Sequence, residues 1–197
     1  MHTLINELMD HAYENYKLSQ SPSEFKKFCE FYYSLRCKNV LEIGSYCGGT
    51  FYMLCKLGHP MGTKISLDYP IYDNQIFDES YQRFLGNAPS FADNVHVLIG
   101  DSHQEVTVQN VERILGEKKL DFLFIDGDHT YQGVKLDYEM YKHFVKPGGY
   151  IAFHDIGNSY WHRQFNCEVD KLWNELPAGN KLTFNLSGYM GIGVVQV

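Results

Sequence analysis

Hydrophobic and polar positions along the chain follow two periods in turn, which predict helices separated by strands. Apolar residues at helical spacing open the chain, and short continuous apolar runs then alternate with further helical patterns. The predicted helices cover residues 3–17, 21–35, 50–58, 73–86, 103–116, 134–145 and 168–176. The predicted strands lie within residues 39–44, 63–68, 94–102, 120–129, 150–155, 181–186 and 190–197, and KPGG at residues 146–149 is predicted as a turn before the fifth strand.

The alternation of five apolar strands with helices predicts an α/β fold. Such an order is typical of a doubly wound parallel sheet with helices on both faces. The strands are apolar throughout, as expected where both faces of a sheet are buried. The last two strands leave no room for a crossover helix, so we expect a hairpin there. The prediction is a Rossmann-like seven-stranded sheet, parallel except for one antiparallel strand near the C-terminal hairpin.

Composition and charge limit the classes of binding partner that we expect for this protein. The formal net charge is −7 and the isoelectric point is about 5.7, which argues against nucleic acid or an anionic membrane as the main partner. Five cysteines, none in a CxxC pair, fit reduced thiols in a cytoplasmic protein. The N-terminus has no basic region followed by an apolar core, and no apolar run approaches the roughly 20 residues of a membrane span.

The stretch LEIGSYCGGT at residues 41–50 places three glycines just after a predicted strand. In open parallel sheets the ligand lies beyond the carboxyl ends of the strands. Three residues separate Gly44 from Gly48, so the spacing departs from the G-x-G-x-x-G pattern and disfavours a nicotinamide dehydrogenase. A structural turn that binds no ligand is the alternative.

Acidic residues follow the predicted strands and indicate which ligand the loop holds. Glu42, Asp68, Asp101, Asp126 and Asp155 all lie at or near strand ends, and such a rim repels a pyrophosphate. A ligand with an ammonium group, a sulfonium group and ribose hydroxyls suits this rim. S-adenosylmethionine has all three and no phosphate.

We therefore expect an S-adenosylmethionine site with distinct roles for its residues. Glu42 would anchor the loop and the positive methionine end, and Asp68 would accept hydrogen bonds from the ribose. Asp101 and Ser102 would meet the adenine edge. Thr50, near a helix N-terminus, would bind the methionine carboxylate. The other expected cofactor-binding residues are Gly44, Tyr46, Gly48 and Asp126.

Two stretches carry a resemblance to a known family. VLEIGSYCGGT resembles the glycine loop of catechol O-methyltransferase, and DFLFIDGDHTYQGVKLDYEMYKHFVKPGGYIAFHDI resembles the macrolide-sugar and rhamnosyl O-methyltransferases. The chain thus resembles class I S-adenosylmethionine-dependent methyltransferases, and among them the metal-dependent O-methyltransferases. We expect one domain over residues 1–197, with N-terminal helices in 1–36, a cofactor-binding core in 38–157, and a C-terminal helix and hairpin in 158–197.

The resemblance implies a divalent metal ion, Mg²⁺ or Mn²⁺, held by Asp126 and Asp155. Two carboxylates with waters and substrate oxygens suit a hard octahedral ion. The sugar enzymes often carry an acid just before the second aspartate, where this chain has His154. His154 is the third expected ligand, and its imidazole favours Mn²⁺, Fe²⁺ or Zn²⁺ over Mg²⁺.

The resemblance also implies a catalytic role for His129 together with Asp126. The sugar enzymes carry a histidine at the position of His129, and a histidine is a suitable general base near neutral pH. Plainer alternatives stay open: Asp126 orients the loop, His129 caps a helix and His154 hydrogen-bonds within the cleft. Asp128 is expected to cap the helix that begins near Thr130.

The predicted function is methylation of a hydroxyl on a small molecule, such as a sugar or a glycosylated natural product. The alternatives are a metal-independent N- or C-methyltransferase, and an accessory protein that binds S-adenosylmethionine without catalysis. Loops 69–94 and 156–181 would select the acceptor, with Tyr131, Tyr160 and residues 161–163 near the cleft. A homodimer is a further expectation.

Overall fold

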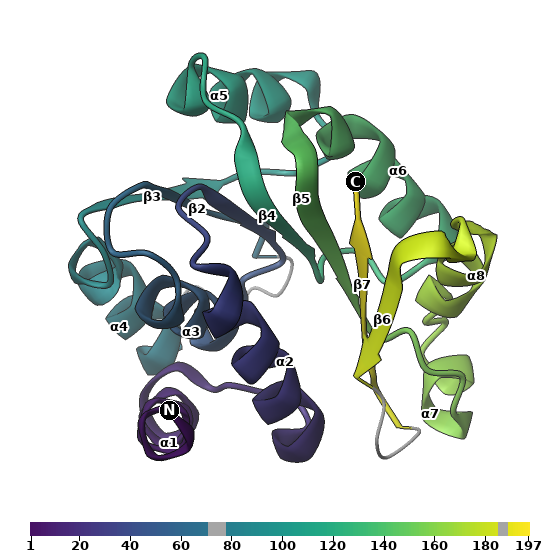
Figure 1. Ribbon diagram of the computed structural model, residues 1–197, viewed down its shortest axis with the longest axis horizontal. Coiled ribbons are helices and arrows are strands. Elements are labelled where there is room, and N and C mark those ends of the chain that lie inside the picture. Colours follow the sequence, from purple (N-terminus) through teal and green to yellow (C-terminus); the bar gives the residue numbers. More distant parts are fainter. Residues whose placement is uncertain (71–77, 185–188) are drawn as a thin grey trace.

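The computed structural model describes residues 1–70, 78–184 and 189–197, which form a seven-stranded sheet between two layers of helices (Figure 1). The strands lie in the order β3-β2-β1-β4-β5-β7-β6. Their bounds are β1 Val40–Ile43, β2 Thr63–Asp68, β3 Asn94–Ile99, β4 Leu120–Ile125, β5 Val145–His154, β6 Lys181–Phe184 and β7 Ile192–Gln196. Strand β7 runs antiparallel to both of its neighbours, β5 and β6, whereas the pairs from β3 to β5 are parallel. The predicted fold class is confirmed.

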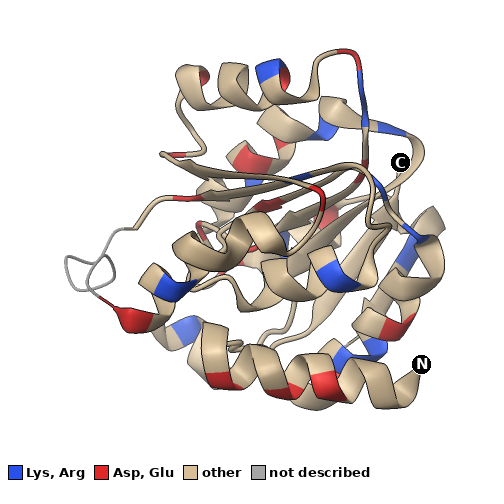
Figure 2. Ribbon diagram, turned by 90° about the vertical axis from the view of Figure 1, so that its left-hand side faces the viewer, with Lys and Arg blue, Asp and Glu red and all other residues tan. Residues whose placement is uncertain are grey.

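The helices follow the predicted apolar periodicity. They are α1 His2–Tyr16, α2 Pro22–Leu35, α3 Gly49–Leu57, α4 Glu79–Asn87, α5 Glu105–Leu115, α6 Tyr131–Tyr141, α7 Tyr160–Gln164 and α8 Val169–Glu175. Helix α1 buries Ile5 and Met9 but exposes Glu7, Asp10 and Glu14. Figure 2 shows acidic residues along this helix. Its apolar stripe therefore faces the protein and its charged stripe faces solvent.

Alternate strand residues supply the two halves of the core. Phe122 and Phe124 on β4 pack with α1 to α4, whereas Leu123 and Ile125 pack with α5, α6 and α8. The ring of Phe28 on α2 lies 5.9 Å from that of Phe122 and 5.4 Å from that of Phe124, measured between ring centroids. Both faces of β4 are covered, which explains its continuous apolar sequence.

Two predicted boundaries are wrong around residues 131–149. Helix α6 begins before the predicted 134–145 segment and ends at Tyr141, because Lys142–Phe144 form a 3₁₀ turn. The KPGG segment, residues 146–149, was predicted as a turn before the strand but lies within β5. Pairing with β4 shifts there, so this part of β5 bulges from the regular ladder.

The remaining differences concern the acceptor loops. Within the predicted helix 73–86, the described part begins at Glu79, and residues 73–77 lie outside the described residues. Residues 185–186 of the predicted strand 181–186 also lie outside them. Helix α7 was not predicted. Across the described ranges, no helix combines the length and apolarity needed to cross a membrane.

Lys64 should be a stabilising residue although it is charged. Its side chain is fully buried, and Nζ donates to the carbonyl oxygens of Lys38, Cys37 (3.5 Å) and His59 (3.1 Å). Burial lowers the pKa of Lys64. We expect Lys64→Met to lower the free energy of unfolding by about 2–4 kcal/mol, because the carbonyls lose their donor. Urea denaturation measures this change.

The matched control is Lys27→Met, which removes an exposed lysine 3.6 Å from Glu30. That variant should change stability by no more than about 0.5 kcal/mol. Equal stability of the two variants would contradict the structural role of Lys64.

Candidate active site

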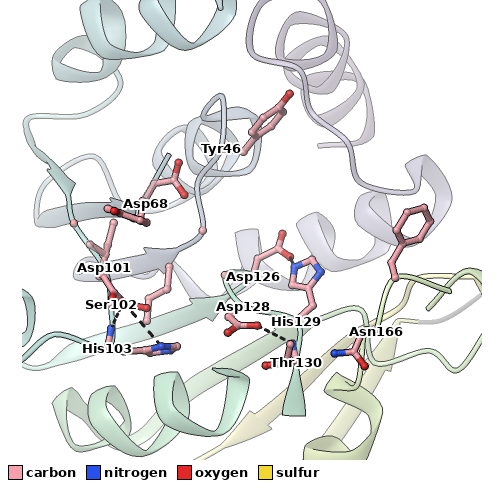
Figure 3. Close-up of a pocket in the computed structure, with 17 residues that line it drawn as sticks. Tyr46, Asp68, Asp101, Ser102, His103, Asp126, Asp128, His129, Thr130 and Asn166 are labelled. Atoms are coloured by element: carbon pink, nitrogen blue, oxygen red, sulfur yellow. Dashed lines mark hydrogen bonds and ion pairs between the residues drawn. The ribbon is translucent and has the colours of Figure 1, made fainter. Parts of the chain in front are cut away.

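The carboxyl ends of the parallel strands open on a cavity of about 680 Å³. Figure 3 shows the polar side chains that surround it. They come from the loops after β1, β2, β3 and β4, and the segment after α7 adds Phe165 and Asn166. The predicted cofactor residues that line it are Gly44, Tyr46, Asp68, Asp101, Ser102 and Asp126. Parallel strands therefore bring residues from distant parts of the sequence to one site.

The glycine loop passes very close to the end of β4. Gly44 has φ +87°, and a Cβ there would collide with the backbone carbonyl of Asp126. Gly48 has φ +82°, and a Cβ there would collide with the ring of Phe84. Packing alone therefore requires these two glycines. Close packing therefore explains why these two positions of the loop are glycines, and a ligand can still bind above the loop.

Gly44→Ala should destabilise the protein by about 2–4 kcal/mol, because both the backbone conformation and the packing oppose a side chain. Thermal unfolding would measure the loss. The control is Gly86→Ala in α4, where a Cβ meets open space. Alanine there should stabilise the helix by about 0.5–1 kcal/mol. A Gly44→Ala variant as stable as wild type would contradict the observed loop packing.

Three predicted cofactor residues do not line the cavity: Glu42, Gly48 and Thr50. Glu42 is fully buried, and burial raises the pKa of its carboxyl well above the ordinary value. Thr50 is buried in the first turn of α3, where Oγ1 accepts a hydrogen bond from Gln20 Nε2 (3.2 Å). A direct contact of these residues with the cofactor stays a prediction.

The predicted metal and base residues form one compact group, here called the Asp–His cluster: Asp126, His129, His154 and Asp155. His154 Nδ1 lies 3.0 Å from Asp126 Oδ1 and 3.4 Å from Asp155 Oδ2. The two ring nitrogens of His129 each lie 3.2 Å from one of the same carboxylates. Asp155 has φ +58°, a conformation that non-glycine residues rarely adopt except at functional sites and turns.

Charges within the Asp–His cluster compensate one another. Burial opposes a charge on either imidazole, yet the two carboxylates raise the pKa of His129 to about 11 and that of His154 to about 10. Burial likewise opposes ionisation of Asp126 and Asp155, but the histidines hold their pKa values below the ordinary range. His129 can act as a base only when another cation neutralises the carboxylates.

These shifts predict how the stability of the metal-free protein depends on pH. The raised histidine pKa values stabilise the fold fully below the ordinary value of 6.5, and this contribution disappears as pH rises through about 10 and 11. The lowered pKa values of Asp126 and Asp155 stabilise the fold above the ordinary value of 3.8. This contribution is lost as the pH falls below 3.8 toward the pKa values of the folded protein. Urea unfolding from pH 3 to pH 10 should show a maximum between about 4 and 6.5.

His154→Gln is the control for this pH profile, since it removes one of the two histidines of the Asp–His cluster whose pKa values are raised on folding. Its stability should decline less steeply between about pH 7 and pH 10 than that of wild type. A wild-type profile that stays flat over this alkaline range would contradict the charge assignment.

Two residues that were not predicted as part of the metal site contact the carboxylates of the Asp–His cluster. Gln20, buried between α1 and α2, donates from Nε2 to Asp126 Oδ2 (3.0 Å). His162 of α7 places Nε2 3.2 Å from Asp155 Oδ1. His162 was expected in the substrate wall, but it is buried against Asp155 instead. No local pattern around Gln20 indicates this contact, since 106 positions separate it from Asp126.

Two further residues near the cavity, His103 and Asp128, can be compared with the predictions from the sequence. His103, which was given no role in the predicted site, lines the cavity beside Ser102, with Nε2 3.2 Å from buried Asp137. Its position next to two predicted adenine contacts was a usable signal. The predicted cap by Asp128 is wrong, because Thr130 caps α6 by accepting from the backbone N–H of Gly133 (3.0 Å). Asp128 Oδ1 instead accepts from the backbone N–H of Thr130 (2.9 Å), in the turn before the helix.

Comparison with known proteins places the chain in a family. A family model described as a methyltransferase domain matches residues 41–156. The O-methyltransferase TomG from Streptomyces achromogenes, involved in tomaymycin synthesis and solved with S-adenosylmethionine, has a TM-score of 0.66 at 13% identity, covering 97% of this chain and 89% of its own. An O-methyltransferase from Bacillus cereus, solved with S-adenosylhomocysteine, has a TM-score of 0.62 at 17% identity, covering 99% and 91%.

A curated relative, the uncharacterized protein R132 of Acanthamoeba polyphaga mimivirus, is 43% identical over 60 residues. That match spans 30% of this chain and 27% of the relative's own length, so it adds no argument about the whole protein. The family match covers more than half of the chain. The chain therefore belongs to the methyltransferase-domain family, and the predicted methyltransferase class is confirmed at the level of family and fold.

Proposed function

We propose that the protein is an S-adenosylmethionine-dependent O-methyltransferase that works with a divalent metal ion. Its acceptor would be a hydroxyl on a small molecule such as a sugar or a glycosylated natural product. One observation carries the proposal: a single cavity has the acids Asp68 and Asp101 on its wall together with Asp126 and His129 of the Asp–His cluster. The neighbours described as O-methyltransferases support the reaction class.

The cavity residues fit S-adenosylmethionine. About 680 Å³ lies within the range usual for small-molecule sites, and the acidic wall suits a ligand without phosphate. Asp68 would hold the ribose, and Ser102 with His103 would meet the adenine. Tyr46 and Asp126 would face the methionine end. When bound, the cofactor would supply an activated methyl group.

The Asp–His cluster fits a divalent metal ion. One atom each of Asp126, His154 and Asp155 lies within 4.8 Å of the others, and such carboxylate and imidazole groups are common ligands. An ion held there would make an acceptor hydroxyl more acidic.

The protein's own groups would then position the acceptor and remove its proton. His129 keeps 39% of its side chain exposed, more than any other member of the cluster, and it lines the cavity. It is therefore the group placed to take a proton from the acceptor. Most of the rate gain would come from holding the reactants in line in a water-poor site.

The test combines calorimetry with a methyl-transfer assay. Purified protein should bind S-adenosylmethionine and transfer labelled methyl groups to hydroxylated acceptors, and EDTA should stop the transfer. Absence of cofactor binding would contradict the whole proposal. Transfer that EDTA leaves unchanged would favour a metal-independent N- or C-methyltransferase. Cofactor binding without transfer to any acceptor would favour an accessory protein.

A further inference from the structure

Three atoms of the Asp–His cluster have the spacing of metal ligands. His154 Nδ1 lies 3.0 Å from Asp126 Oδ1 and 3.4 Å from Asp155 Oδ2. Ligand atoms about 2.1 Å from an octahedral ion, at right angles, are about 3.0 Å apart. His154 is only 6% exposed, and within the described part of the chain its Nδ1 makes no hydrogen bond of acceptable geometry. A buried nitrogen that faces two carboxylate oxygens without a well-aligned hydrogen bond is arranged to share an ion with them.

Each carboxylate of the cluster has its outer oxygen already occupied. Gln20 Nε2 donates to Asp126 Oδ2 at 3.0 Å, and His162 Nε2 lies 3.2 Å from Asp155 Oδ1. The backbone N–H of Ser159 donates to His162 Nδ1 (3.1 Å), so Nε2 carries the proton that His162 donates. Asp126 Oδ1 and Asp155 Oδ2 are therefore the inward oxygens, and they face His154 Nδ1 and the ring nitrogens of His129.

We propose that Asp126, His154 and Asp155 bind a first-row transition-metal ion, such as Mn²⁺, Fe²⁺ or Co²⁺, in preference to Mg²⁺. Gln20 and His162 are positioning residues that fix which oxygen of each aspartate faces the ion. The inference rests on the proposed metal-assisted function and specifies its metal. Mg²⁺ prefers oxygen ligands and keeps its waters, whereas imidazole nitrogen favours transition metals.

A nearby thiol favours the same class of ion. Cys167 is buried, and its sulfur lies within 4.8 Å of ligand atoms of His129 and Asp155. A soft donor next to the carboxylates adds to the preference for a transition metal over Mg²⁺. It also provides a reason to test the metals anaerobically, with the thiol reduced.

The test uses the full chain with metal ions alone, without acceptor. Mn²⁺ binding is followed by electron paramagnetic resonance, and Mg²⁺ is added as competitor. The electron spin echo of bound Mn²⁺ should show modulation from a histidine nitrogen. His154→Asp should remove that modulation and lower the preference for Mn²⁺ over Mg²⁺ by about tenfold. His129→Gln is the matched control and should retain the modulation.

The positioning residues are tested by affinity. Gln20→Met and His162→Gln should weaken Mn²⁺ binding by about 10- to 100-fold while keeping the nitrogen modulation, because every ligand remains. Gln109→Met is the control, since Gln109 is an exposed glutamine whose side chain donates a hydrogen bond to Glu105 on the same helix (3.4 Å), and Mn²⁺ affinity should not change. Circular dichroism verifies that each variant is folded.

Four results would overturn the inference. A wild-type echo without nitrogen modulation, or an unchanged metal preference in His154→Asp, would show that the imidazole is not a ligand, while Mg²⁺-assisted transfer could stand. Modulation lost in His129→Gln but kept in His154→Asp would assign the nitrogen to the other histidine. No metal binding, with transfer unaffected by EDTA, would also contradict the metal part of the proposed function.

Discussion

Asp126→Asn should lower the kcat of methyl transfer by about 10²- to 10³-fold, the largest effect expected for a single isosteric change in this protein. The carboxylate has 13% of its side chain exposed and contacts His129, His154 and Gln20. An amide keeps the shape but removes the charge that both histidines and a metal ion require. Initial rates with labelled S-adenosylmethionine would measure the loss.

The control is Asp128→Asn, two positions away. Asp128 is exposed and accepts a hydrogen bond from the backbone of Thr130. Its replacement should change kcat by less than about threefold, since this exposed hydrogen bond in the turn before α6 contributes mainly to local stability. If Asp126→Asn keeps near wild-type activity, the Asp–His cluster is not the reaction centre.

Asp68→Ala should weaken binding of S-adenosylmethionine by about a hundredfold. Hydrogen bonds from two ribose hydroxyls to a carboxylate contribute about 1.5 kcal/mol each, and about 3 kcal/mol corresponds to that factor. Asp68 ends β2 and lines the cavity, so the change acts on binding. Isothermal calorimetry on the metal-free protein measures it separately from any metal effect.

Asp101→Ala serves as the comparison at the opposite end of the predicted ligand. Asp101 Oδ1 accepts from the backbone of His103 (2.8 Å) and is only partly available to a ligand, so we expect about a tenfold loss. A normal affinity in Asp68→Ala would show that the cofactor lies elsewhere or in another orientation.

The sheet and much of the cavity were predictable because they depend on local pattern. Continuous apolar runs predicted each strand of the parallel core, and parallel strands end at a common edge. Asp68, Asp101 and Asp126 therefore came together as expected. The KPGG segment was misjudged because Pro and Gly favour a turn and a bulge alike.

The electrostatic state of the site could not be read from the sequence. His129 was placed correctly at the cavity wall, but its charge depends on two carboxylates, one of them 26 positions later, at the end of another strand. Gln20 and His162 reach the cluster only through tertiary packing of segments outside the parallel strands. Local periodicity contains no information on such contacts.

Gln20 contacts the Asp–His cluster from outside the part of the chain that matches the family model. The family match covers residues 41–156, and both Gln20 and His162 lie outside it. An N-terminal loop and a five-residue helix thus contact the carboxylates of Asp126 and Asp155, which lie within the family match. On the proposed function, exchange of these two peripheral segments would alter metal affinity while Asp126, His154 and Asp155 stay the same, and an isolated 41–156 domain would lack both positioning residues.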